Sequence, residues 1–95
     1  MLEILDQGYP PRIGLLVRQH INDEYDGRKN WHMGTMALQL NVSRPNLSVF
    51  LNGHSMLSNK LAYNVQKQFP HLDAEEMLHY QAVWEYRRWY SKNAK

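Results

Sequence analysis

Apolar residues recur at intervals of three and four along most of the chain, and polar segments separate the repeats. Because this spacing puts apolar side chains on one face of a helix, it predicts an all-α protein of about five short helices. The repeats, in chain order, are Ile13, Leu16, Val17 and Ile21; Met33, Met36, Ala37 and Leu40; Leu47, Phe50 and Leu51; and Leu61, Ala62, Val65 and Phe69. A last helix, dense in aromatic residues, is expected over about residues 74–90.

Residues at the ends of these repeats predict where the helices begin and end. Pro11 can start the first helix, because a proline in the first turn forfeits no helical hydrogen bond, whereas Gly14 is an unfavourable residue inside it. Residues 23–30 are polar and contain a glycine, which is typical of an exposed connector. Ser58 is a candidate N-cap for the fourth helix, and Asp73 for the fifth.

The second and third helices are expected to meet at a tight corner. Asn41 is the residue that permits it, because asparagine tolerates positive φ better than any other residue except glycine. Ser43 then caps the third helix, with Pro45 in its first turn. Over about residues 33–53 this is the plan of a helix-turn-helix, whose second helix, here residues 43–51, enters the DNA major groove. Because all-α proteins also contain inert helical hairpins, the helical pattern alone leaves that alternative open.

If the apolar residues of the third helix face inward, its outward residues have chemistry suited to DNA bases. Arginine pairs with guanine, asparagine with adenine, and valine or proline contacts the thymine methyl group. The predicted base-reading positions are Arg44, Pro45, Asn46, Ser48 and Val49. Ser43, Asn52 and His54 lie near the ends of the helix, where contacts with backbone phosphates are expected.

The string ALQLNVSRPNLSVFLNG at residues 37–53 resembles the helix-turn-helix of the XRE, or lambda-repressor-like, family, and in particular its HigA-type antitoxins and plasmid-maintenance antidote proteins. The similarity covers about residues 9–90, including Pro10-Pro11, residues 57–65 and residues 75–86. Carried over by position, Arg44, Pro45 and Val49 match base-reading positions, Asn46 and Ser48 lie beside them, and Ser43 and Asn52 match phosphate-contacting positions.

The resemblance implies a five-helix lambda-repressor-like DNA-binding domain that forms a homodimer and binds a palindromic double-stranded DNA operator. It also implies repression of its own operon and neutralisation of a RelE-like toxin that cleaves mRNA. The chain departs from the family at Asn41, where a glycine is usual, and at Met77, where tryptophan is common. Two other functions stay open: a protein-interaction module on the same scaffold, and a solitary phage-like regulator without a toxin.

Composition fits this interpretation without requiring it. The 95 residues suit one domain spanning 1–95, and the formal net charge of +2 permits polyanion binding but does not demand it. Without cysteine there is no disulfide or thiolate metal site, and without a long apolar run no membrane span, so we expect a cytoplasmic protein. The five histidines have no helical ligand spacing, and the carboxylates lack a neighbouring nucleophile. We therefore expect no metal, no cofactor and no enzymatic activity.

The predicted last helix has more aromatic side chains than one buried face accommodates. A terminal helix of a small domain buries about one face, so the surplus favours a dimer or partner interface, where tryptophan and tyrosine are enriched. The predicted interface residues are Trp84, Tyr86, Trp89 and Tyr90. For Trp89 and Tyr90, burial in the core is an equally open alternative.

Overall fold

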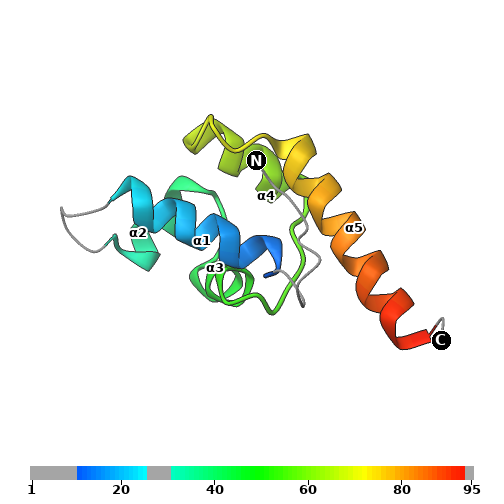
Figure 1. Cartoon of the computed structure of the whole chain (residues 1–95). Helices are drawn as coiled ribbons and strands as arrows, with labels where there is room; N and C mark the ends of the chain where they lie inside the picture. The colour runs from blue at the N-terminus through cyan, green and yellow to red at the C-terminus, as the bar shows by residue number, and fades with distance from the viewer. Residues whose placement is uncertain (1–10, 26–30, 94–95) are drawn as a thin grey trace.

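The computed structural model describes residues 11–25 and 31–93, and within these ranges it contains five α-helices and no strand. In chain order the helices are α1 (Ile13–Glu24), α2 (Met33–Gln39), α3 (Arg44–Leu51), α4 (Asn59–Gln68) and α5 (Ala74–Asn93) (Figure 1). The all-α prediction is confirmed for this part of the chain, and α5 runs three residues past its expected end. The predictions for Pro10 and for most of the connector, residues 26–30, fall outside the described residues.

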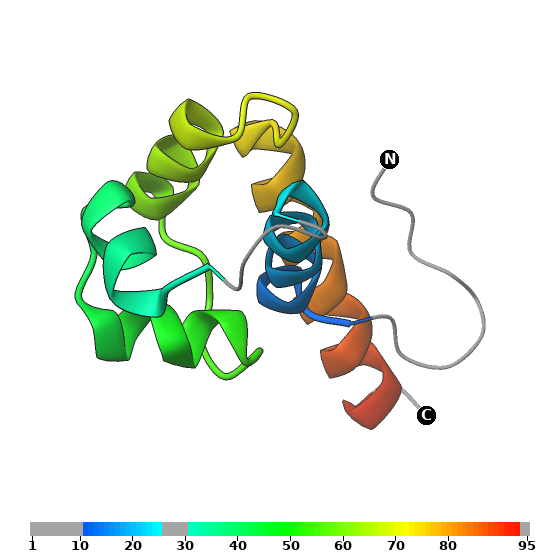
Figure 2. The ribbon, with the colours of Figure 1, turned by 90° about the vertical axis from the view of Figure 1, so that its left-hand side faces the viewer.

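Buried apolar side chains from all five helices and their connections form one cluster: Ile13, Val17, Ile21, Met36, Ala37, Leu40, Leu47, Phe50, Leu51, Leu57, Leu61, Ala62, Val65, Phe69, Leu72, Met77, Tyr80 and Trp84. These include most of the predicted inward positions, while Leu16 and Met33 are only partly buried against the cluster. Helix α5 lies beside α1 and α4, and its C-terminal half extends beyond them (Figures 1 and 2). No described helix combines the length and the apolar character needed to cross a membrane.

Gly14 allows α1 and α3 to approach closely. A Cβ atom built at Gly14 would lie 1.9 Å from the backbone oxygen of Phe50 and 2.9 Å from its carbonyl carbon. Because both atoms belong to the backbone of α3, no rotation of a side chain could make room for it. The glycine that weakens the helical pattern is therefore the residue that this helix contact requires.

A buried glutamine joins α5 to the loop between α3 and α4. The side chain of Gln81 is 8% exposed, and its Nε2 donates to the backbone oxygen of Leu57 at 3.0 Å. The backbone N–H of Leu57 donates in return to Gln81 Oε1 at 2.6 Å. Since both backbone groups of Leu57 are satisfied by one side chain, the loop is fixed in position without secondary structure of its own.

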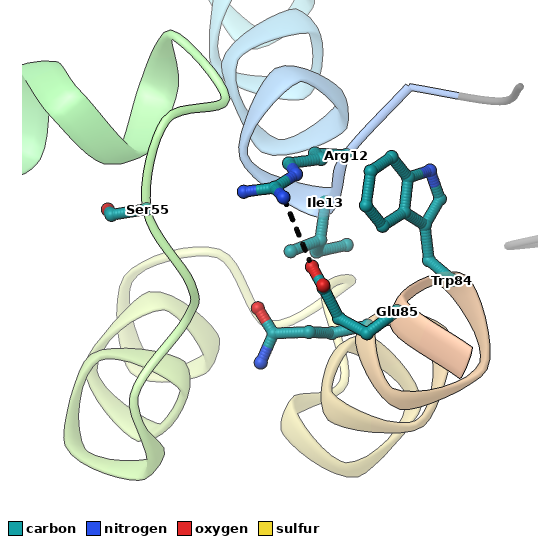
Figure 3. A pocket seen from close by; sticks show the side chains of 6 residues that line it. Arg12, Ile13, Ser55, Trp84 and Glu85 are labelled. Carbon is teal, nitrogen blue, oxygen red and sulfur yellow. Dashed lines mark ion pairs between the residues drawn. The ribbon is translucent and has the colours of Figure 1, made fainter. Parts of the chain in front are cut away.

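The start of α1 is held against α5 by Arg12 and by a tyrosine hydroxyl. The guanidinium of Arg12 lies 4.7 Å from the centre of the Trp84 ring and 3.5 Å from Glu85 Oε2 (Figure 3). The Tyr80 hydroxyl donates to the backbone oxygen of Pro11 at 2.7 Å. Burial raises the pKa of Tyr80 above its ordinary value, because the phenolate would lose its hydration.

The prediction that Trp84 belongs to an intermolecular interface is wrong, because its side chain is 9% exposed and forms part of the core of this chain. Trp84 lies three residues after Gln81 and four after Tyr80, on the face of α5 that packs against the other helices. Helical spacing shows which aromatic residues of α5 share a face, but it does not show which face the fold covers.

Candidate functional site

The corner between α2 and α3 is a tight backbone turn closed by two hydrogen bonds. Asn41 has a φ of 54°, so the prediction of positive φ is confirmed. The N–H of Asn41 donates to the Leu38 oxygen at 3.2 Å, and that of Val42 donates to the Ala37 oxygen at 3.0 Å. This pair of bonds is a Schellman motif, which ends α2 and turns the chain directly into α3.

Helix α4 secures the same corner from the other side. Asn64 Nδ2 donates to the backbone oxygen of Leu40 at 3.1 Å, and this oxygen belongs to the C-cap of α2. The contact satisfies a carbonyl that the helix end leaves without an intrahelical partner. The angle between α2 and α3 is therefore fixed by the local turn and by a tertiary hydrogen bond.

Both ends of α3 are closed by local contacts, and the beginning is closed in the way that the sequence predicts. Ser43 is the N-cap, and its Oγ accepts from the N–H of Asn46 at 3.2 Å, while Pro45 occupies the first turn. At the other end Gly53 has a φ of 80°. Its N–H donates to Phe50 O at 3.0 Å, and the N–H of His54 donates to Val49 O, also at 3.0 Å. These contacts make α3 a short helix with a fixed beginning and end.

Helix α3 presents one side to the core and the other to solvent. Leu47, Phe50 and Leu51 are buried, as predicted. On the outer side, Val49 is 42% exposed. The predicted base-reading positions are exposed, apart from Ser48, which is partly buried: Arg44, Pro45, Asn46, Ser48 and Val49. A guanidinium, an amide and two apolar groups are thus available to a ligand on one helix.

The three flanking residues have different surroundings. The Ser43 oxygen is engaged as the helix cap, and His54 is exposed beyond the C-terminal end of α3. Asn52 Oδ1 accepts from Arg18 Nη1 at 2.6 Å, which brings a cation from α1 to the end of α3. Local sequence patterns do not reveal the role of Arg18, because 34 positions separate it from Asn52.

The charges are distributed unevenly along the chain. Residues 31–72, which contain α2, α3 and α4, include no aspartate or glutamate, and their cationic side chains are Arg44, Lys60 and Lys67. Lys60 lies in the first turn of α4 and is exposed. The whole-chain charge of +2 hides this segregation, although the missing carboxylates can be read directly from the sequence. The segment around α3 can therefore approach a polyanion without carboxylate repulsion from its own residues.

An open groove of about 330 Å³ lies between α3 and the segment that leads to α4. Asn46 and Val49 line it from the outer side of α3, and Met56 lines it from the connecting segment. Met56 is 58% exposed. The remaining lining residues are Val42, Phe50, Ser55, Ser58 and Leu61. The apolar pattern does not reveal Met56, because the residue lies outside every helical repeat.

A second exposed surface lies on the C-terminal half of α5. Tyr86, Trp89 and Tyr90 are 60%, 56% and 53% exposed, so the alternative that Trp89 and Tyr90 belong to the core is wrong. The ring centre of Tyr86 lies 6.2 Å from that of Trp89 and 6.1 Å from that of Tyr90. The three rings form one patch, called here the α5 aromatic patch. Its role as a dimer or partner interface stays a prediction.

Within residues 11–25 and 31–93, no group of three or more histidine, cysteine, aspartate or glutamate side chains is arranged to hold a metal ion. In comparisons with known proteins, neither a family model, nor a curated protein, nor a solved structure matches this chain.

Proposed function

We propose that this chain is a sequence-specific DNA-binding protein in which α2 and α3 form a helix-turn-helix of the lambda-repressor-like type. The observation that carries the proposal is the closed corner at Asn41 followed by a capped helix whose exposed outer side carries a guanidinium, an amide and two apolar groups. A helix held in this way by its partner helix fits the major groove, which is about 12 Å wide in B-DNA. Helix α3 is the proposed recognition helix.

Base contacts are assigned to the exposed residues of α3. Arg44 donates to guanine, Asn46 pairs with adenine, and Val49 meets a thymine methyl group. Pro45 and Ser48 lie between them on the same helix. Each bidentate contact of this kind discriminates between base pairs by about 1–3 kcal/mol.

Phosphate contacts are assigned to the residues around the ends of α3. Ser43, Asn52 and His54 lie there, and Lys60 stands in the first turn of α4, whose N-terminus attracts anions. Such contacts position the protein on the duplex and make its affinity fall with salt concentration. The carboxylate-free segment 31–72 supports this assignment.

A single recognition helix reads only a few base pairs, so the proposal includes a homodimer on two half-sites about 34 Å apart. The α5 aromatic patch is the proposed dimer surface, because exposed tryptophan and tyrosine are typical of interface cores. The resemblance to HigA-type antitoxins extends the proposal to a cytoplasmic repressor that regulates its own operon and neutralises a RelE-like toxin.

The test is selection of bound duplexes from a random DNA pool, followed by fluorescence anisotropy with the selected duplex and a scrambled duplex at several salt concentrations. We expect the selected sequence to bind about a thousandfold more tightly. Arg44→Ala is expected to relax the preference at one base position, whereas Arg87→Ala, an exposed arginine on α5, leaves it unchanged. Equal, weak binding to both duplexes would contradict the proposal.

A second candidate function is capture of a protein partner through the α5 aromatic patch, with the helix-turn-helix serving only as scaffold. The exposure of three large aromatic side chains favours it. Equal binding to both duplexes, together with a monomer in sedimentation analysis, supports this candidate over the first. Selective DNA binding by a dimer that Trp89→Ser dissociates supports the first.

A further inference from the structure

The groove beside α3 has apolar side chains in its wall from both of the segments that form it. Val49 and Met56 are both substantially exposed and line the same groove, one from α3 and one from the segment that follows it. Asn46 lines it too, one helical turn before Val49 and therefore on the same side of α3. An amide thus stands beside two apolar side chains that the fold of the chain leaves uncovered.

These groups match the major-groove edge of an A·T base pair. Adenine presents an N7 acceptor and an N6 donor to an asparagine amide, and thymine presents a C5 methyl group. Of the four bases only thymine has an apolar group at this edge, so an apolar wall beside an amide distinguishes A·T from the other pairs. The unbranched methionine side chain adapts its shape to such a small group.

We propose that Met56, together with Val49, contacts the 5-methyl group of thymine and makes the protein select A·T pairs beside the base that Asn46 contacts. This inference rests on the proposed DNA-binding function and adds a specificity-determining residue outside the recognition helix. A duplex is favoured over an apolar small molecule or peptide because the surrounding segment has Arg44 and Lys60 and no carboxylate. That charge complements a polyanion.

The experiment replaces thymine by deoxyuridine, one position at a time, in a duplex obtained by selection. This substitution removes the methyl group and preserves base pairing and every hydrogen-bonding group. At one or more thymines of each half-site, native protein is expected to bind the deoxyuridine duplex roughly fourfold more weakly, which corresponds to one buried methyl group. Affinities unchanged at every position would overturn the inference while leaving DNA binding established.

A double-mutant cycle assigns the effect to Met56. In Met56→Ala the deoxyuridine substitution is expected to have a smaller effect than in native protein, because one of the two side chains that contact the methyl group is already missing. Leu38→Ala is the matched control, since Leu38 is 83% exposed and lies outside the groove, and here the fourfold loss should persist. A deoxyuridine effect of equal size in Met56→Ala and native protein would overturn the role of Met56.

A thermal scan of Met56→Ala and the result of the DNA selection distinguish a failure of this inference from misfolding of the variant and from a failure of the proposed function. Met56 is 58% exposed, so Met56→Ala is expected to melt at the temperature of the native protein, which a thermal scan verifies. If the selection returns no preferred sequence, the proposed function fails together with this inference. If it returns a sequence that lacks A·T pairs, the inference fails together with the base contacts assigned to Asn46 and Val49, while sequence-specific DNA binding stands.

Discussion

The contact between α1 and α3 is tested by the substitution Gly14→Ala. The added Cβ would stand 1.9 Å from the Phe50 oxygen, so the two helices must separate by more than about 1 Å to restore an ordinary contact. Overpacking of this kind costs about 1–3 kcal/mol, and a backbone neighbour places it at the upper end. Alanine returns at most about 1 kcal/mol through helix propensity. The expected net loss of unfolding free energy is therefore about 2 kcal/mol.

Gly34→Ala is the matched control, because Gly34 is the second residue of α2 as Gly14 is of α1. A Cβ at Gly34 meets nothing closer than His32 Nδ1 at 3.5 Å, which is an ordinary contact. Only the propensity gain remains, so this variant is expected to be more stable by up to about 1 kcal/mol. The same chemical change thus has opposite effects at equivalent helix positions.

Thermal unfolding followed by circular dichroism measures both variants. At about 4–8 °C per kcal/mol for a domain of this size, Gly14→Ala should lower the melting temperature by about 8–16 °C, and Gly34→Ala should raise it by up to about 8 °C. A Gly14→Ala protein that melts at or above the native temperature would refute the close helix contact. Equal losses in the two variants would refute the attribution of the loss to Phe50.

Three further predictions concern Gln81, Asn41 and Tyr80. Gln81→Leu leaves the buried N–H and C=O of Leu57 without partners, so it should lower the unfolding free energy by about 3 kcal/mol, measured by urea denaturation. A loss below about 1 kcal/mol would contradict the importance of these two hydrogen bonds. Asn41→Val should lower the unfolding free energy by about 1–2 kcal/mol, because a branched residue resists positive φ. Asn41→Gly should stay within about 0.5 kcal/mol of the native protein. Equal stability of the two variants would contradict the requirement for positive φ at this corner. Because the folded-state pKa of Tyr80 is raised, the stability it contributes is complete below about pH 10 and is lost as the pH rises through that pKa. In an ultraviolet titration, Tyr80→Phe should lack the one phenol whose pKa is raised, and the variant should not show the loss of stability at high pH that comes from this phenol. An unchanged titration curve would contradict the burial of Tyr80.

Much of the fold can be predicted from the sequence, because the helix ends are set by local contacts. Ser43 and Ser58 accept from the N–H three residues later, and Asp73 accepts from the N–H of Glu76 at 2.9 Å. Asn41 takes the positive φ that its residue type allows. Helix α5 ends three residues beyond its predicted end, and there Asn93 Nδ2 donates back to the Trp89 oxygen at 2.8 Å.

The candidate site was only partly predictable for a different reason. The exposed residues of α3 follow from its own periodicity once its apolar side is known. Arg18 reaches Asn52 across 34 positions, and Met56 joins Val49 in a groove only because the connecting segment turns back along α3. No pattern within either segment encodes these approaches, which depend on how the helices pack.

By itself, the sequence determined where the helices lie, how α2 ends and α3 begins, and which side of α3 faces the core, because these depend on neighbours within one or two turns. Only the tertiary structure decided that Trp84 is buried while Tyr86 is exposed, because both faces of α5 are apolar and the fold covers one of them. It also decided that Gly14, which is unfavourable within its own helix, is required for the close contact of that helix with α3. Local propensity and tertiary packing are separate free-energy terms, and at such positions only the packed structure shows which is larger.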